Sequence, residues 1–342
     1  MREHGLESLV RLGANESAFG PSPRAVEAMR AELERLSWYG DPESFALRTA
    51  LARKHGCRIE QLVVGSGIDE LMGLVVRAFV APGGAALTTR GSYPTFNYHV
   101  SGYGGRLVTA DYRADGRLDL DALIAVARAE RPTVVYLANP DNPSGTFVER
   151  DELARFVDAL PDDALVLLDE AYADFVDAGR LIAPEIDDRI VRTRTFSKAY
   201  GLAGARIGYA IASDAHVATL QKIRLHYGVN RNAQIGALAS LEDEAFHAHV
   251  VREVEASREA YYALARELGL GYLESYTNFV CIDLGSASRA TRVMNELLER
   301  GVWIRKPGAP PLDRYVRVSA GTAPMREAFA AALRAVLDEV PA

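Results

Sequence analysis

Short runs of apolar residues recur through the first two thirds of the chain, and they mark the strands that we expect. The runs are rich in β-branched residues and are bounded by glycine, proline or polar residues. Segments of this kind are typical of strands that are buried on both faces of a sheet. They are residues 61–67, 133–139, 164–172, 190–196 and 206–213.

Helical periodicity separates these strands. The segment that begins near Asp119 has apolar residues on one helical face, namely Leu120, Leu123, Ile124 and Ala127. Because strands that alternate with helices form parallel sheets, the pattern predicts an α/β fold with a mostly parallel central sheet flanked by helices.

The pattern changes near Leu241. One long helix is expected over residues 241–269, and shorter strands and amphipathic helices follow it to the end of the chain. The strands are expected within residues 278–285, 302–308 and 315–321. Separate strands and helices of this kind predict a smaller α+β domain.

The first forty residues contain one predicted helix. Ser22 is its expected N-cap and Pro23 its first residue. We expect this N-terminal arm and helix, residues 1–40, to pack with the small domain. The large ligand-binding domain is then residues 41–240 and the small C-terminal domain residues 241–342.

Composition narrows the class of protein. The chain has 342 residues, 49% hydrophobic and 25% charged, which is typical of a globular protein with more than one core. Its net charge of −7 argues against nucleic acid as a partner. No apolar run is long enough to span a membrane, and the N-terminus lacks the apolar core of a signal peptide. Cys57 and Cys281 have no zinc-like spacing, so we expect no metal site and a cytoplasmic protein.

Candidate binding groups lie where the predicted strands end, which is where open α/β sheets bind ligands. Gly65, Ser66 and Gly67 lead from a strand into a helix, and the free N–H groups of that helix can bind an anion. A plain tight turn explains the same residues. Glu70 takes the place of the third glycine of the dinucleotide-binding motif, so that motif is absent.

Two more strand ends carry polar groups. Asn142 lies in the rigid turn "NPDNPSG" after the strand at 133–139. Asp169 follows four apolar residues, and a carboxylate in such a poorly solvated position needs a cationic partner. Tyr172 can reach the same pocket. The alternative is a surface carboxylate at the exit of a strand.

The segment "RTRTFSKAYGLAGARIGY" combines hydroxyl groups, one amine, several glycines and one guanidinium. Thr195, Ser197 and Arg206 suit a phosphate, and Lys198 is an amine at its edge. Taken with the other strand ends, these groups predict one ligand with a phosphate, a basic ring nitrogen, a phenolic oxygen and an aldehyde. Pyridoxal 5′-phosphate has all four, with Lys198 on the aldehyde and Asp169 on the ring nitrogen. Asn142 and Tyr172 then suit the phenolic oxygen, and a freed Lys198 can carry a proton.

The motifs resemble those of fold-type I, class I and II pyridoxal-phosphate aminotransferases, and most closely the histidinol-phosphate aminotransferase family. The resemblance covers nearly the whole chain, from "LGANESAFGPSP" through "GSGIDELM", "NPDNPSG" and "TFSKAYGLAGARIG" to "YVRVSAGT". It implies a fold-type I enzyme in which Lys198 forms the Schiff base and the Gly67 and Ile68 backbone joins the phosphate site.

The same resemblance implies roles for four further side chains. Phe96 is expected to stack on the ring face of the cofactor. Tyr39 matches a tyrosine that reaches the cofactor phosphate of the neighbouring subunit, which implies a homodimer. Arg317 is expected to bind the anionic end of the substrate, and Arg305 is a second arginine at that end.

The implied reaction is the transfer of an amino group between an amino substrate, with histidinol phosphate favoured, and a 2-oxo acid such as 2-oxoglutarate. Ser17 stands where some members have a tyrosine that helps to bind the substrate phosphate. An aromatic or other amino acid is therefore an alternative donor, and decarboxylation of a phosphorylated amino acid uses the same cofactor chemistry. A sensor domain of a transcription regulator is disfavoured, because fourteen residues precede Asn15 and the net charge is negative.

Overall fold

The computed structural model describes residues 9–182 and 186–339. Within these residues, seven strands form the largest sheet, in the order β2-β8-β7-β6-β5-β3-β4. The strands are β2 (Leu62–Gly65), β8 (Gly208–Ile211), β7 (Ile190–Thr195), β6 (Leu165–Asp169), β5 (Val134–Ala138), β3 (Ala85–Thr89) and β4 (Arg106–Ala110). β8 pairs antiparallel with β2 and β7, and the remaining pairs are parallel. The predicted α/β fold with a mostly parallel sheet is confirmed.

The five predicted strands all lie in this sheet, while β3 and β4 were not predicted. Glycine pairs at residues 83–84 and 104–105 precede them. The sequence of β3, "AALTT", has no β-branched apolar residue, so the signal of a buried strand is weak.

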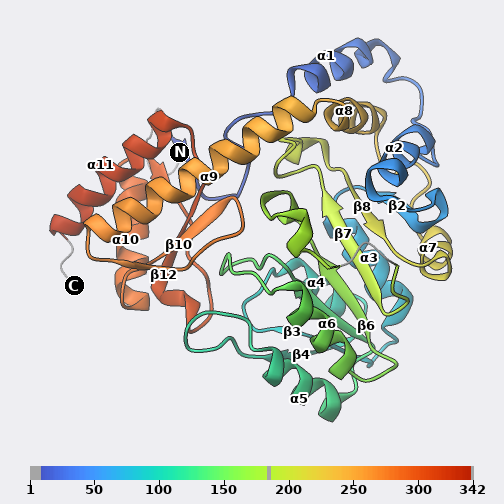
Figure 1. Cartoon of the computed structure of the whole chain (residues 1–342), viewed down its shortest axis with the longest axis horizontal. Coiled ribbons are helices and arrows are strands. Elements are labelled where there is room, and N and C mark those ends of the chain that lie inside the picture. The colour runs from blue at the N-terminus through green and yellow to red at the C-terminus, as the bar shows by residue number, and fades with distance from the viewer. Residues whose placement is uncertain (1–8, 183–185, 340–342) are drawn as a thin grey trace.

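Two layers of helices cover the sheet (Figure 1). They are α2 (Phe45–His55), α3 (Ile68–Phe79), α4 (Thr95–Gly102), α5 (Leu120–Glu130), α6 (Arg150–Ala159), α7 (Asp214–Gln221) and α8 (Arg231–Leu241). Alternate residues of a central strand join different apolar clusters, as the period of a strand requires. In β5, Tyr136 packs with α3 and α4, whereas Val135 and Leu137 pack with α5 and α6.

The C-terminal part has its own sheet and apolar core, and Figure 1 shows it beside the larger sheet. Strand order is β12 (Tyr315–Ser319), β10 (Phe279–Asp283) and β9 (Gly271–Tyr272). The helices are α9 (Glu244–Glu267), α10 (Ala287–Glu299) and α11 (Ala323–Glu339). Val280, Leu297 and Phe329 are among the fully buried residues of this core. The domain boundaries remain predictions.

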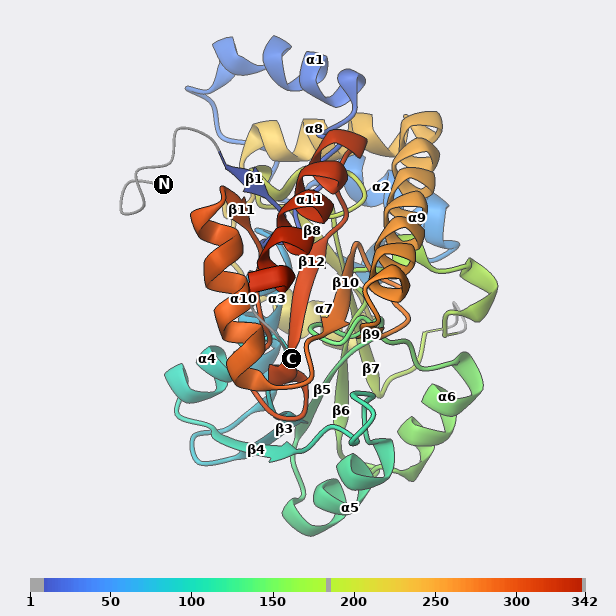
Figure 2. The same cartoon turned by 90° about the vertical axis from the view of Figure 1, so that its left-hand side faces the viewer.

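The N-terminal arm is divided between the two parts. β1 (Val10–Arg11) pairs in parallel with β11 (Val302–Trp303) of the C-terminal part. Helix α1 (Pro23–Ala31) was expected to pack with the small domain, but it packs on α8, as Figures 1 and 2 show. The Ser22 hydroxyl caps α1 as predicted and also donates to Asp243 at the start of α9. The arm therefore connects both parts of the molecule.

Short 3₁₀ helices complete the secondary structure. They are η1 (Leu33–Arg35), η2 (Ile59–Gln61), η3 (Ala173–Phe175), η4 (Ala178–Arg180), η5 (Ala203–Ala205) and η6 (Leu312–Arg314). Among the helices that the structure describes, none has the length and apolar character needed to cross a membrane.

Candidate active site

A cavity of about 730 Å³ lies at the carboxyl ends of β5, β6 and β7, where the large sheet meets the N-terminal arm and the C-terminal part. Most of the predicted site residues line it. They are Ile68, Asn142, Asp169, Tyr172, Thr195, Ser197, Lys198, Arg206, Arg305 and Arg317. Residues far apart in sequence thus meet at one place, as the rule for strand ends predicts.

Lys198 provides an amine to this cavity. It follows β7 by three residues, and its Nζ donates to the Asn15 carbonyl oxygen at 3.0 Å. Burial lowers the pKa of Lys198 to about 8, and the positive charge of Arg317 acts in the same direction. A lysine with a lowered pKa is neutral in a larger fraction of molecules, so it is a better nucleophile for an aldehyde.

Asp169 provides a carboxylate at the floor of the cavity. It is the last residue of β6 and is buried, and its oxygens accept from the Tyr136 hydroxyl at 2.8 Å and the Ala171 N–H at 3.0 Å. Burial raises the pKa of the Asp169 carboxyl to about 6, while the two hydrogen bonds and Lys198 act to lower it. A buried carboxylate of this kind fits a ligand with a protonated ring nitrogen, which would relieve the cost of burying the charge.

The opposite end of the cavity can hold a phosphate. Helix α3 begins at Ile68, and the N–H groups of its first turn have no partner within the helix. Gly67 has a φ of +84°, and a Cβ at this position would lie 2.7 Å from an Arg206 guanidinium nitrogen. Arg206 itself is held by Asp69, with Nη2 and Oδ2 3.1 Å apart. Glycine adopts this φ without strain and leaves room for the Arg206 guanidinium, and the donors around it fit the phosphate of pyridoxal phosphate.

Tyr172 and Asn142 line the wall between these ends. The Tyr172 hydroxyl accepts a hydrogen bond from Asn15 Nδ2 at 3.0 Å. Burial raises the pKa of Tyr172, so the phenol keeps its proton. Asn142 Oδ1 accepts from Arg317 Nη1 at 2.6 Å, which leaves its amide nitrogen as a donor toward the cavity.

Cationic groups gather at the substrate end. Arg317 is held by Asn142 and by the Gly13 carbonyl, and its Nε has no hydrogen-bond partner among the described residues. Burial lowers the pKa of Arg317. Arg305 pairs with Arg317 through both backbones, and its guanidinium lies 5.2 Å from the Trp303 ring. Lys306 also lines the cavity. This end is built for an anion.

Three predicted residues are not among those that line the cavity. Gly67 lies just before α3, beside the Arg206 guanidinium. Phe96 was expected on the ring face of the cofactor, but it is fully buried and stacks on Tyr136, with ring centroids 4.9 Å apart. Tyr93, three residues earlier, lines the cavity instead, and its hydroxyl donates to Asp69 Oδ1 at 2.9 Å. Tyr39 lies outside the cavity and is 78% exposed. Its ring packs against that of Tyr227, with the ring centroids 4.5 Å apart.

Sequence reasoning missed three residues that shape the site. Asn15 contacts Lys198 and Tyr172, Tyr136 contacts Asp169, and Tyr93 lines the wall. Tyr136 could have been expected from its place inside the apolar strand β5, because a buried tyrosine hydroxyl needs a hydrogen-bond partner. Asn15 has no such local signal, since its partners are more than 150 residues away.

Comparisons with known proteins identify the family. Residues 7–333 match the family model described as aminotransferase class I and II. The histidinol-phosphate aminotransferase of Moorella thermoacetica is 36% identical over 342 residues, which cover 98% of this chain and 87% of that protein. The protein of the same name from Geobacillus thermodenitrificans is 36% identical over 329 residues, or 94% and 88% of the two chains.

A solved structure agrees with the sequence relatives. The crystal structure of histidinol-phosphate aminotransferase from Sinorhizobium meliloti in complex with pyridoxal-5′-phosphate has a TM-score of 0.96 and 41% sequence identity. The match covers 99% of this chain and 94% of that chain. The predictions of the family, the fold type and the cofactor are confirmed. The chain therefore belongs to the class I and II aminotransferases, a family of enzymes that use pyridoxal phosphate.

Proposed function

We propose that this enzyme transfers the amino group of histidinol phosphate to a 2-oxo acid, with 2-oxoglutarate as the acceptor. The observation that carries the proposal is the joint position of Lys198, Asp169 and two arginines around one cavity. The names of the relatives at 36% and 41% identity support the phosphorylated donor.

The cofactor supplies an electron sink for the carbanion that forms at the substrate Cα. Asp169 is suited to keep the ring nitrogen protonated, because a buried carboxylate is stabilised by a cation beside it. Asn142 and Tyr172 are suited to donate to the phenolic oxygen. Thr195, Ser197 and Arg206, with the backbone of Gly67 and Ile68, are suited to hold the phosphate.

Lys198 has two tasks in this proposal. Its amine would hold the cofactor through the aldehyde, and as a free amine it would take up or deliver a proton at the substrate Cα. Its pKa of about 8 suits both tasks, because the amine exchanges protons readily near neutral pH.

A phosphate donor fits the charge at the substrate end. Arg305, Lys306 and Arg317 line the same end of the cavity, and Lys306 Nζ now donates only to the Asp313 carbonyl, at 3.0 Å, among the described residues. Three cations suit a dianion with three oxygens better than a single carboxylate.

A carboxylate donor is the second candidate. Arg317 is oriented by Asn142, so its planar guanidinium can bind a carboxylate through two N–H groups. The carboxylate of an aromatic or other amino acid would bind the two N–H groups of Arg317 and would not need Lys306.

The test compares kcat/KM for histidinol phosphate with kcat/KM for phenylalanine and tyrosine, with 2-oxoglutarate as the acceptor. We expect histidinol phosphate to be the better donor, and Lys306→Met to lower kcat/KM for it more than for the amino acids. Arg317→Ala should lower kcat/KM for either class by roughly 30- to 5,000-fold, since losing one partner of a charged pair costs about 2–5 kcal/mol. Turnover of an amino acid with no turnover of histidinol phosphate would reject the proposed donor.

We further propose that the enzyme is a cytoplasmic homodimer. Large apolar side chains are exposed on and near the arm: Leu33, Leu36, Trp38, Tyr39, Phe45, Leu225 and Tyr227. Exposed apolar side chains gathered in this way mark an interaction surface. A second copy would cover them, and Tyr39 could then reach the phosphate of that copy's cofactor.

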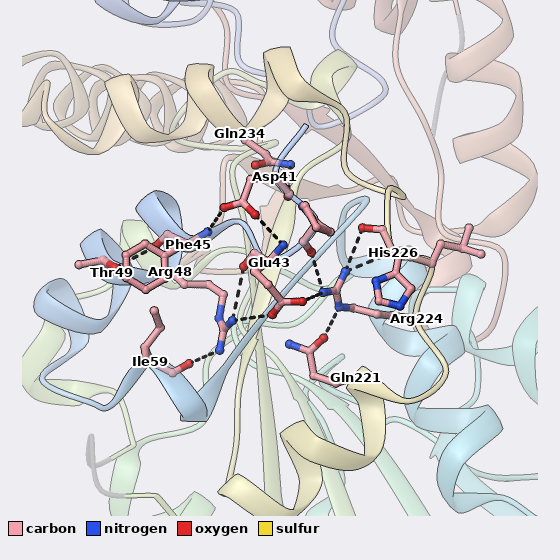
Figure 3. Close-up of polar contacts among 12 residues, drawn as sticks. Asp41, Glu43, Phe45, Arg48, Thr49, Ile59, Gln221, Arg224, His226 and Gln234 are labelled. Atoms are coloured by element: carbon pink, nitrogen blue, oxygen red, sulfur yellow. Dashed lines mark hydrogen bonds and ion pairs between the residues drawn. The ribbon is translucent and has the colours of Figure 1, made fainter. Parts of the chain in front are cut away.

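The residues that directly follow Trp38 and Tyr39 are held by a group of polar contacts, which Figure 3 shows. The Glu43 carboxylate lies 3.2 Å from Arg48 Nη1 and 3.1 Å from Arg224 Nη2. Arg224 Nη2 also donates to the Pro42 carbonyl at 2.6 Å. Such a support keeps an exposed segment in one conformation, which lowers the entropic cost of an interface.

A further inference from the structure

Asn15 lies between β1 and α1 in a backbone conformation that few residues adopt. Its φ is +54°, and only 3% of its surface is exposed. Asparagine is one of the residues that tolerate this left-handed region, and a buried residue held there is over-determined by its surroundings. Asn15 also lines the cavity.

The backbone of Asn15 binds both halves of the site. Its N–H donates to Ser319 Oγ at 2.9 Å. Its carbonyl oxygen accepts from Lys198 Nζ at 3.0 Å and from Asn278 Nδ2 at 3.1 Å. The carbonyl therefore holds the amine of Lys198 in place.

The side-chain amide of Asn15 has one consistent orientation. Ser319 Oγ accepts from the Asn15 N–H, so its own proton is free to donate to Asn15 Oδ1, 3.2 Å away. With Oδ1 on this side, Nδ2 must face the Tyr172 hydroxyl, 3.0 Å away. An amide nitrogen only donates, so the Tyr172 oxygen accepts there and its proton must point elsewhere.

We propose that Asn15 is a positioning residue that directs the hydroxyl proton of Tyr172 into the cavity. This inference rests on the proposed role of Tyr172 as a donor to the phenolic oxygen of the cofactor. Asn15 contacts Tyr172 through its side-chain amide, and it acts on the cofactor through that hydroxyl.

The proposal predicts a shift in a titration of the holoenzyme. The phenolic oxygen shares a proton with Lys198 Nζ, the nitrogen that joins the cofactor to the protein. A hydrogen bond donated to that oxygen weakens its hold on the shared proton. Loss of the bond should therefore raise the pH midpoint of the yellow colour of the bound cofactor. Asn15→Asp replaces the amide donor with an acceptor, which would draw the Tyr172 proton away from the cavity. We expect a rise of about one to two pH units.

Asn15→Gly distinguishes the effect of the Asn15 side chain from that of its backbone. Glycine adopts a φ of +54° without strain and keeps the carbonyl for Lys198, so only the amide is lost. We expect a smaller rise than for Asn15→Asp. Asn278→Ala is the matched control, because it removes a donor to the same carbonyl without a contact to Tyr172, and it should leave the midpoint unchanged.

A double-mutant cycle with Tyr172→Phe tests whether Asn15 affects the cofactor through Tyr172. If Asn15 acts through Tyr172, Asn15→Gly will not shift the midpoint further in the Tyr172→Phe protein. An equal shift in that background, or a wild-type midpoint in Asn15→Gly, would overturn the proposal. A wild-type holoenzyme without a pH-dependent colour would instead reject the proposed attachment at Lys198, so the two failures are distinguishable.

Discussion

At the scale of residues, Lys198 and Asp169 have environments that shift their pKa values toward each other, from about 10.5 and 3.8 to about 8 and 6. Both shifts come mainly from burial, and a buried amine and a buried carboxyl in one cavity mark a functional site. The two shifts lead to separate predictions, because one concerns the attachment of the cofactor and the other concerns the stability of the protein without it.

Lys198→Ala should fold but should not hold the cofactor covalently. Borohydride reduces the bond between a lysine nitrogen and the cofactor to a stable amine, so the denatured wild-type protein should keep the mass of the cofactor and the variant should not. Lys54→Ala, at an exposed lysine of α2, is the control and should behave like the wild type. Mass spectrometry of the reduced, denatured proteins measures this, and covalently bound cofactor in the Lys198→Ala protein would contradict the assignment.

Asp169→Asn should stabilise the cofactor-free protein at high pH. The pKa of the Asp169 carboxyl rises from 3.8 to about 6 on folding, so the folded state loses stability as the pH rises through this interval. Above pH 6 the variant should exceed the wild type in free energy of unfolding by up to roughly 3 kcal/mol, and below pH 4 the two should converge. Urea unfolding across pH measures this difference, and a constant offset would contradict it. The same variant should lose most activity.

At the scale of elements, periodicity predicted the strands that carry the site but not β3 and β4, the two strands at one side of the sheet. The runs that became β5, β6 and β7 have strong apolar patterns because both faces of each strand are buried. β3 lacks that pattern, and it is positioned by pairing with β4 and β5. Asp169 and Lys198 could be predicted because strand ends converge. The burial of Phe96 could not, since it depends on how α4 packs against Tyr136.

The start of α3 should be sensitive to a single added methyl group. Gly67→Ala would bring a Cβ against the Arg206 guanidinium and should weaken binding of pyridoxal phosphate to the cofactor-free protein. Gly83→Ala is the matched control, because Gly83 has a φ of +78° and no atom within 4 Å of an added Cβ. Both variants should lose about 1 kcal/mol of stability from backbone strain, but only Gly67→Ala should bind less cofactor. A fluorescence titration of cofactor binding measures the difference, and equal affinities would contradict it.

At the scale of the whole molecule, the exposed arm predicts an assembly. Light scattering should give a mass near twice 37.2 kDa. Arg224→Ala removes contacts to Pro42 and Glu43, so the arm should lose its fixed conformation and the dimer should dissociate at higher protein concentrations than the wild type. Arg53→Ala, at an exposed position of α2, is the control. A monomer that is fully active would reject the proposed role of Tyr39.

The hydrogen bonds of Asn15 to Ser319 also bear on how the protein is made. These residues are 304 positions apart, so one wall of the cavity is synthesised well before its partner. The large sheet, from β2 to β8, is complete on the ribosome long before β12 exists. During that interval Asn15 has no Ser319 to bind, so the carbonyl that accepts from the Lys198 amine lacks this support. The nascent chain can therefore fold its largest sheet early, but it acquires a closed active site only after residue 319 has left the exit tunnel.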